Sequence, residues 1–275
     1  MIHKLEKQDF YKVKPLLKKE AEINNISVQA VINGTNIGNI YVDNLERPQA
    51  AIIDATGTTC YFVGDAGNAV FGSSLKDCIE NQLKAACLES GGSYFIATLF
   101  DEAWEKVLEQ AIAHREFETD YEFSYTFNPE RFRAMKEKHP ILAKEYRLKK
   151  IDRDVIENDE EDTLADSLGD FWETTDEFLA LGEGYCILRG NEVVSYCLSC
   201  YVDGNKHEIS VETCDEEVQN QGLATIVSRA YLEQCLQRGI VPAWSTFETN
   251  TPSVKLANKL GYEFQSKWRT YEFEY

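Results

Sequence analysis

The order of elements in the second half of the chain constrains the fold most strongly. Strand-like runs end at the turn signals Gly190-Asn191 and Asp203-Gly204, which predict a three-stranded antiparallel meander over 184–188, 193–202 and 207–213. A helix, a strand, a helix and a strand should follow, over 221–237, 241–247, 253–260 and 267–273. Because the first of these helices is a crossover connection, the strands on either side of it should be parallel.

The first half of the chain shows a similar alternation. Strands are expected over 26–33, 37–43, 49–54, 61–63, 94–99 and 122–127, and helices over 5–24, 75–89 and 102–114. Asn33-Gly34 is a hairpin signal between the first two strands. The fold class is therefore α/β (α+β), with a mixed, mostly antiparallel twisted sheet in the C-terminal half and a smaller α/β domain before it.

A basic segment with two prolines separates the halves. Residues 129–146 predict a connecting helix and linker, with an anion-binding patch as the alternative reading of their charge. The expected domains are then an N-terminal α/β domain over 1–128 and a second domain over 147–275.

The net charge of the chain bears on which molecules it can bind. The chain has a formal net charge of −19, which would repel nucleic acid at long range and attract a cationic substrate, or simply keep the protein in solution. No apolar run reaches the length of a membrane helix, and no signal peptide precedes the first helix. Eight cysteines in apolar or periodic segments suit reduced thiols in the cytoplasm, and no pattern indicates a metal site.

The loop before helix 221–237 has the composition of an anion site. It reads Gln219-Asn220-Gln221-Gly222-Leu223-Ala224, and the start of a helix offers unpaired backbone N–H groups and a partial positive charge. Phosphates bind at such positions, and Gly222 would let the backbone approach one closely. An ordinary strand-to-helix turn is the alternative for this hexapeptide taken alone.

Two motifs in this order resemble the GNAT N-acetyltransferase superfamily. The loop matches Gln/Arg-x-x-Gly-x-Gly/Ala, the acetyl-CoA-binding motif of that superfamily, and about 30 residues later the run from Asn250 to Tyr262 resembles its second signature. The whole chain is similar to a prokaryotic two-part subfamily of about this length. The first half lacks the motif, so it is expected to be a degenerate GNAT-like domain, or alternatively an unrelated α/β cap.

The resemblance implies a coenzyme A site. Backbone amides of the loop would hold the pyrophosphate, the end of strand 207–213 would pair with the pantetheine arm, and the amide of Glu212 would polarise the acetyl carbonyl. Asn250 would contact the pantetheine. The residues expected to bind acetyl-CoA are Val211, Glu212, Thr213, Gln219, Asn220, Gln221, Gly222, Leu223, Ala224, Thr225 and Asn250.

A carboxylate base is needed because an alkylamine is almost fully protonated at pH 7. The resemblance places it at Glu208, eleven residues before Gln219, with Glu212 on the same strand face as the second candidate. Either glutamate could instead be an ordinary solvated side chain. Two features depart from the family pattern. Ala257 stands at the position where many members have a tyrosine that acts as general acid, and Gln-Asn-Gln replaces the usual arginine-rich motif.

The predicted activity is direct acetyl transfer from acetyl-CoA to an amine of a small molecule or peptide within a ternary complex. The alternatives are a non-catalytic acyl-CoA-binding sensor and a pure interaction protein. No nucleic-acid or membrane partner is expected, and the sequence leaves open whether the chain forms a homodimer.

Overall fold

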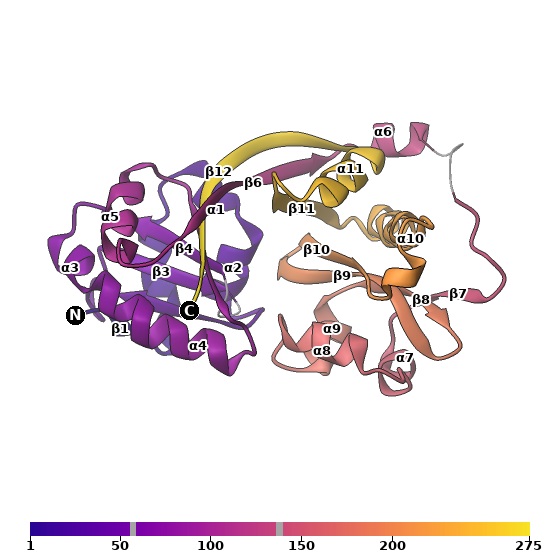
Figure 1. The fold of residues 1–275 in the computed structure, drawn as a ribbon, viewed down its shortest axis with the longest axis horizontal. Helices are drawn as coiled ribbons and strands as arrows, with labels where there is room; N and C mark the ends of the chain where they lie inside the picture. Colours follow the sequence, from indigo (N-terminus) through magenta and orange to yellow (C-terminus); the bar gives the residue numbers. More distant parts are fainter. Residues whose placement is uncertain (56–58, 136–139) are drawn as a thin grey trace. The chain divides into compact units, whose positions relative to one another are not determined.

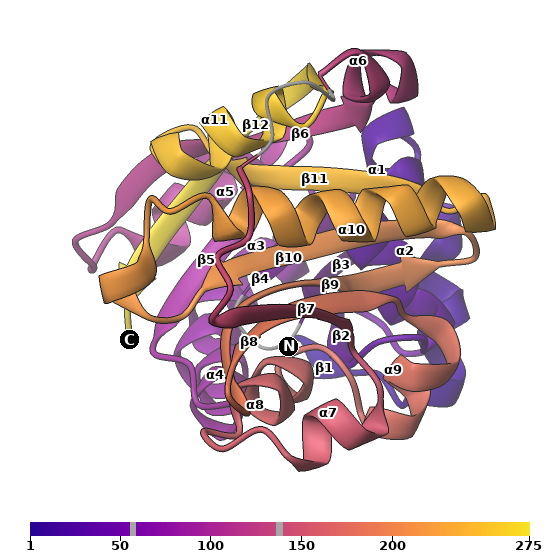
Figure 2. The same ribbon diagram turned by 90° about the vertical axis from the view of Figure 1, so that its right-hand side faces the viewer.

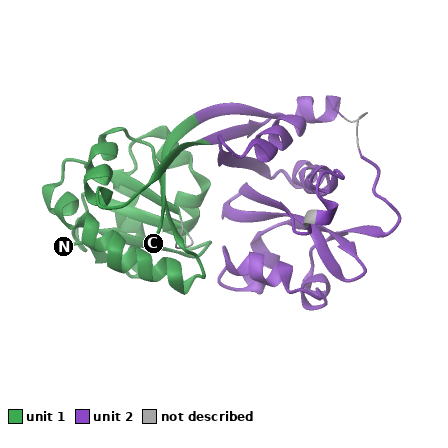
Figure 3. Ribbon diagram, in the orientation of Figure 1, with its two compact units in different colours: residues 1–122, 267–275 green, residues 123–266 purple. Residues whose placement is uncertain are grey.

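The computed structural model describes residues 1–55, 59–135 and 140–275 (Figure 1). The chain forms two compact units: unit 1 comprises residues 1–122 and 267–275, and unit 2 comprises residues 123–266 (Figure 3). The division based on sequence placed all of 147–275 in one domain, whereas the C-terminal residues from Lys267 onward pack in unit 1.

Unit 2 contains the predicted meander and crossover. Its strand order is β12-β6-β11-β10-β9-β8-β7. The strands are β6 (Glu118–Phe127), β7 (Tyr146–Lys150), β8 (Gly184–Arg189), β9 (Glu192–Asp203), β10 (Lys206–Thr213), β11 (Val241–Phe247) and β12 (Tyr262–Glu274). β8, β9 and β10 pair antiparallel, and β10 and β11 pair parallel, which confirms the predicted mixed sheet.

Helices cover both faces of the unit 2 sheet. α10 (Leu223–Arg238) lies on one face, and α7 (Arg153–Glu157), α8 (Thr163–Gly169) and α9 (Thr175–Leu181) lie on the other (Figure 2). Leu223, Val227 and Tyr231 of the predicted apolar stripe of α10 are buried in the core. Unit 2 also contains α6 (Pro129–Ala134), the 3₁₀ helix η4 (Glu216–Val218) and α11 (Thr251–Lys259).

Unit 1 repeats the same order of elements. Its strand order is β1-β2-β3-β4-β5-β12-β6, with an antiparallel meander β2-β3-β4 and a parallel pair β4-β5. The strands are β1 (His3–Lys4), β2 (Gly38–Val42), β3 (Ala50–Ala55), β4 (Thr59–Gly64) and β5 (Tyr94–Leu99). The helices are η1 (Lys7–Leu16), α1 (Glu20–Asn24), α2 (Ile26–Asn33), α3 (Ala69–Asp77), the π-helix η2 (Cys78–Leu83), α4 (Lys84–Glu89) and α5 (Ala103–Ile112).

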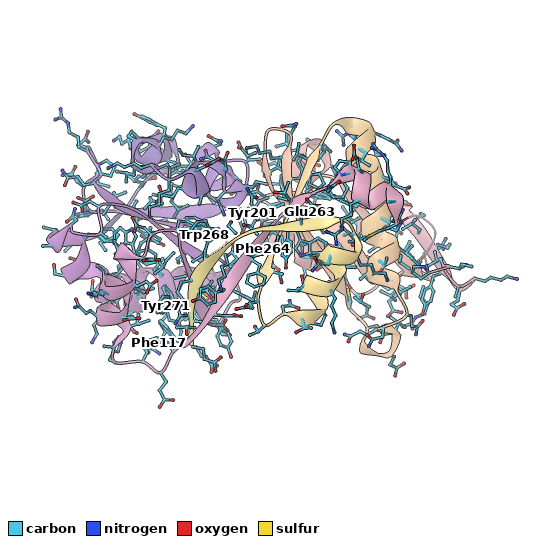
Figure 4. The ribbon with its side chains drawn as sticks, turned by 90° about the horizontal axis from the view of Figure 1, so that it is seen from above. Phe117, Tyr201, Glu263, Phe264, Trp268 and Tyr271 are labelled. Carbon is cyan, nitrogen blue, oxygen red and sulfur yellow. The ribbon has the colours of Figure 1, made fainter. Side chains whose placement is uncertain are left out.

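Two long strands are shared between the units. β6 begins in unit 1 and ends in unit 2, and β12 runs in the opposite sense from unit 2 into unit 1. Along β12, Glu263 and Phe264 belong to unit 2, whereas Trp268 and Tyr271 belong to unit 1 (Figure 4). In unit 1, residues 269–274 of β12 pair antiparallel with β5. The last strand of each half therefore serves both units.

The segment 26–33 is a helix, so the predicted strand and its Asn33-Gly34 hairpin are wrong. Its β-branched residues favoured a strand, but the segment is capped at both ends as a helix. The side chain of Asn25 accepts the backbone N–H of Val28 at 2.8 Å, and Gly34 ends the helix with φ of +71°.

Other differences have local causes. The predicted helix 5–24 is a 3₁₀ segment and a short α-helix, because Pro15 cannot continue an α-helical hydrogen-bond ladder. β7 was not predicted, because its charged sequence, which suits an edge strand, directly follows the basic linker and was included with it. The predicted linker helix is α6 up to Ala134, and basic residues 136 and 138 of the predicted patch lie outside the described residues.

All eight cysteines are free thiols, and seven of them are buried. Within the described ranges, no helix has both the length and the apolar character needed to span a membrane.

The carboxylate of Glu80 in η2 joins the helical run 69–89 to the end of α5. It accepts hydrogen bonds from Arg115 Nε at 2.9 Å and His114 Nε2 at 2.7 Å, and mainly the Arg115 bonds lower the pKa of Glu80 to about 2. A lowered carboxyl pKa stabilises the fold above the unfolded-state value, and this stability is lost as the pH falls toward 2.

We therefore expect Glu80→Gln to lower the free energy of unfolding by about 1 kcal/mol at pH 7, and by much less near pH 2, because water screens this half-buried pair. Urea unfolding at both pH values measures this, with Glu89→Gln, an exposed glutamate of α4, as control. An equal loss at both pH values would contradict an ionic role for Glu80.

Candidate functional site

The site begins where two parallel strands part. β10 and β11 are paired only from Lys206 with Val241 to Glu208 with Ala243, although β10 continues to Thr213. At the same level, the register of β10 against β9 shifts between Glu208 and Ile209. Beyond Glu208, the edge of β10 that faces away from β9 therefore has no partner in the β11 ladder.

Backbone hydrogen bonds show which amides face this open edge. The N–H of Cys214 donates to Val194 O on β9 at 3.0 Å, and the carbonyl of Glu212 accepts Ser195 Oγ, also from β9, at 2.7 Å. Peptide groups alternate in direction along a strand. The backbone N–H and C=O groups of the even-numbered residues of β10 therefore point toward β9. The backbone amides of Val211 and Thr213 point toward the open edge. The amide of Glu212, the oxyanion donor expected from the sequence, lies on the β9 side.

The two candidate carboxylates project from one face of β10. Glu208 accepts a short hydrogen bond from Ser245 Oγ of β11. Glu212 is exposed and accepts the hydroxyl of Tyr196 on β9 at 2.6 Å. Tyr196 in turn accepts Ser167 Oγ from α8 at 2.9 Å, so this chain of hydrogen bonds holds Glu212 toward the α8 side of the sheet.

Further acidic charge lies near Glu212. Burial, and then the charges of Asp166 and Glu212, raise the pKa of Asp170, which follows α8. This face of unit 2 is therefore negative close to the open strand edge, and a protonated amine would be attracted to it.

The first turn of α10 has backbone amides without a side-chain cap. Gly222 precedes the helix with φ of +85°, and among the described residues no side chain caps the amides of Leu223, Ala224 and Thr225. The three preceding side chains, Gln219, Asn220 and Gln221, are exposed. A β-carbon at Gly222 would lie 2.8 Å from the ring of Pro140, so the linker passes directly over this turn.

A lysine of α11 lies beside the first turn of α10. Lys259 of α11 places Nζ 3.1 Å from the hydroxyl of Thr225, in the first turn of α10. Asn250 is the N-cap of α11, and its side chain accepts the N–H of Ser253 at 3.2 Å. Ala257 is fully buried, and its methyl side chain offers no proton donor at that position.

Four contributors were not found from the sequence. Tyr196 and Ser245 reach the carboxylates across neighbouring strands, and their roles depend on strand register, which the sequence pattern did not specify. Lys259 and Pro140 approach α10 from segments whose paths were unknown. The sequence offered a signal for one of these contacts, a lysine near the end of the predicted helix 253–260. That lysine was interpreted only as part of the second GNAT signature.

Comparisons with known proteins identify the family of the chain. A family model described as GNAT acetyltransferase matches residues 14–271. An uncharacterised N-acetyltransferase, YdfB of Bacillus subtilis (strain 168), is 27% identical over 244 residues, which cover 89% of this chain and 88% of the relative.

Two solved structures are similar over nearly their whole length. A GCN5-related N-acetyltransferase-like protein from Streptococcus suis 89/1591 is 25% identical with a TM-score of 0.72, covering 96% of this chain and 98% of that one. A tandem GNAT protein from the clavulanic acid biosynthesis pathway is 13% identical with a TM-score of 0.58, covering 100% and 98%, and shows a shared fold. Since the family model spans both units, the chain belongs to the GNAT acetyltransferase family.

Proposed function

We propose that this protein transfers the acetyl group of acetyl-CoA directly to an amine of a small molecule or peptide, in the cytoplasm. The observation that carries the proposal is the early end of the β10–β11 ladder at Glu208 and Ala243. It leaves the amides of Val211 and Thr213 available to the pantetheine arm, whose own amides could extend the ladder.

Each part of the site has a role in this proposal. The uncapped amides of α10 and the Lys259 ammonium hold the pyrophosphate. The Val211 amide, rather than that of Glu212, donates to the oxygen that becomes negative in the tetrahedral intermediate. Glu208 takes the proton of the attacking amine, directly or through water. Binding requires the ring of Pro140 to move off Gly222.

Ala257 favours a second candidate, a non-catalytic acyl-CoA sensor, because a methyl side chain cannot donate a proton to the departing thiolate where the family pattern has a tyrosine. Calorimetric titration with acetyl-CoA, followed by a thiol-release assay over a panel of primary amines, separates the two. Binding with turnover supports the transferase, and binding without turnover supports the sensor. A wild-type protein that does not bind acetyl-CoA would contradict both.

Lys259→Gln should weaken acetyl-CoA binding about 5- to 10-fold, because one charge-assisted contact to phosphate is lost at an exposed position. The difference should shrink as salt is raised from 0.05 to about 0.5 M, since screening weakens an exposed ion pair. Lys255→Gln, an exposed lysine one turn earlier on α11, is the control for overall charge. Equal effects of the two changes would show that Lys259 makes no specific contact.

A further inference from the structure

Unit 1 contains a cavity of about 670 Å³ that the proposed transfer reaction does not use. Its walls come from the end of η1, from α1, from residues 48–49 before β3, from the end of β4, from the turn 65–67 and from the start of α5. All of its lining residues belong to unit 1.

The cavity occupies the place in unit 1 that the open strand edge occupies in unit 2. β4 and β5 are parallel and paired only from Thr59 with Ile96 to Tyr61 with Thr98. The cavity lies beyond that pairing, between the turn that leads into α3 and the start of α5. The duplicated fold has therefore kept an opening between its parallel strands.

This opening is poorly suited to coenzyme A. The side chain of Asn68 accepts the N–H groups of Val70 and Phe71 at 3.1 and 3.0 Å, so the first turn of α3 is already capped. Asp65 accepts the N–H of Gly67 at 2.9 Å and places a carboxylate where a phosphate would lie. A phosphate would meet the Asp65 carboxylate at this turn, and of the two lysines in the lining, Lys18 and Lys19, the second is already paired with Asp101.

Two carboxylates of the cavity lack a cationic partner. Glu22 is only 3% exposed, and its Oε2 accepts the backbone N–H groups of Lys18 and Lys19 at 2.7 and 3.0 Å. Over residues 1–55, 59–135 and 140–275, no lysine or arginine side chain forms an ion pair with Glu22 or Asp65. The ammonium of Lys19 is engaged by Asp101 at 3.0 Å and by the carbonyl of Phe100 at 3.3 Å.

We propose that this cavity binds a small organic amine, with its ammonium group on Glu22 and Asp65 and its hydrocarbon part on the apolar walls formed by Pro15, Leu16 and Ala66. An ammonium supplies the N–H donors that carboxylate oxygens need. A bare metal ion fits less well, because the described residues contain no group of three His, Cys, Asp or Glu side chains placed to hold one. The site is separate from acetyl transfer and does not depend on it.

The test is an NMR titration of the full-length protein, without acetyl-CoA, with n-butylamine, n-butanol and butyrate as probes. We expect saturable shifts of the Lys18, Lys19 and Gly67 amides with butylamine alone. Glu22→Gln keeps an oxygen that can accept both backbone N–H groups but removes the charge, so it should weaken butylamine binding about tenfold or more. Glu20→Gln, an exposed glutamate of α1 outside the cavity, should leave it unchanged.

Three results would overturn the proposal. These are equal shifts with butanol, an affinity that Glu22→Gln leaves unchanged, and shifts confined to residues of unit 2. A thermal melt of each variant shows whether the fold is retained. If Glu22→Gln is destabilised, Asp65→Asn, which keeps the acceptor for Gly67, replaces it as the test.

Discussion

Gly222→Glu should bind acetyl-CoA at least about 100-fold more weakly than the wild-type protein. A carboxylate at this position would stand at the start of α10, where the proposed pyrophosphate lies, and two like charges in contact cost several kcal/mol. The new side chain would also meet the Pro140 ring and adopt a backbone conformation that non-glycine residues disfavour. Isothermal titration calorimetry measures the affinity.

The helix itself supplies the control. Gly239 ends α10 with φ of +69° and has open space where a β-carbon would lie. Gly239→Glu therefore introduces the same charge and the same backbone strain, without approaching the start of the helix. Gly222→Gln separates the charge from the clash with Pro140. If Gly222→Glu and Gly239→Glu bind acetyl-CoA equally well, the phosphates do not lie at the start of α10.

Glu208→Gln should lower kcat about 10²- to 10³-fold and change KM for acetyl-CoA less than about twofold. A base within reach of the amine accelerates proton removal by about this factor, whereas the proposed phosphate site lies at the start of α10 and Glu208 lies in β10. Glutamine retains an oxygen that can accept the Ser245 hydroxyl, so the local structure should persist. A steady-state assay with saturating amine measures both constants.

The pH profile distinguishes a base from a structural residue. An amine of pKa near 10.4 loses its own proton as the pH rises, so the deficit of Glu208→Gln should shrink between about pH 7 and pH 10. Glu212→Gln is the matched comparison. The Glu212 carboxylate lies on the same face of β10 as Glu208 and accepts the hydroxyl of Tyr196 on β9. A larger loss of kcat in Glu212→Gln than in Glu208→Gln would identify Glu212 as the base. A loss of kcat in Glu208→Gln that does not change with pH would show that Glu208 is not the base.

Local signals predicted unit 2 well. β11 was placed at its observed bounds, and α10 within two residues, because turn residues, caps and apolar periodicity act over a few neighbouring positions. The parallel pairing of β10 and β11 followed from the crossover rule. The fold class could therefore be read from the order of elements.

Features that depend on register or on distant segments could not be read in this way. The side of β10 on which each amide lies is set by pairing with β9, and this moved the proposed oxyanion donor from Glu212 to Val211. The contact of Lys259 with Thr225 depends on how α11 packs near α10. In unit 1, capping at Asn25 and Gly34 outweighed the strand preference of Ile26–Asn33.

The path of β12 has a consequence for biosynthesis. Its residues 269–274 pair with β5, which the ribosome has synthesised long before the C-terminus emerges. Until then, the nascent chain carries an unpaired edge of β5, and such edges recruit other strands and promote aggregation. Completing unit 1 also closes a loop of most of the chain length, which slows folding. The first half of this protein is therefore more prone to aggregation before β12 has been synthesised than after β12 has paired with β5.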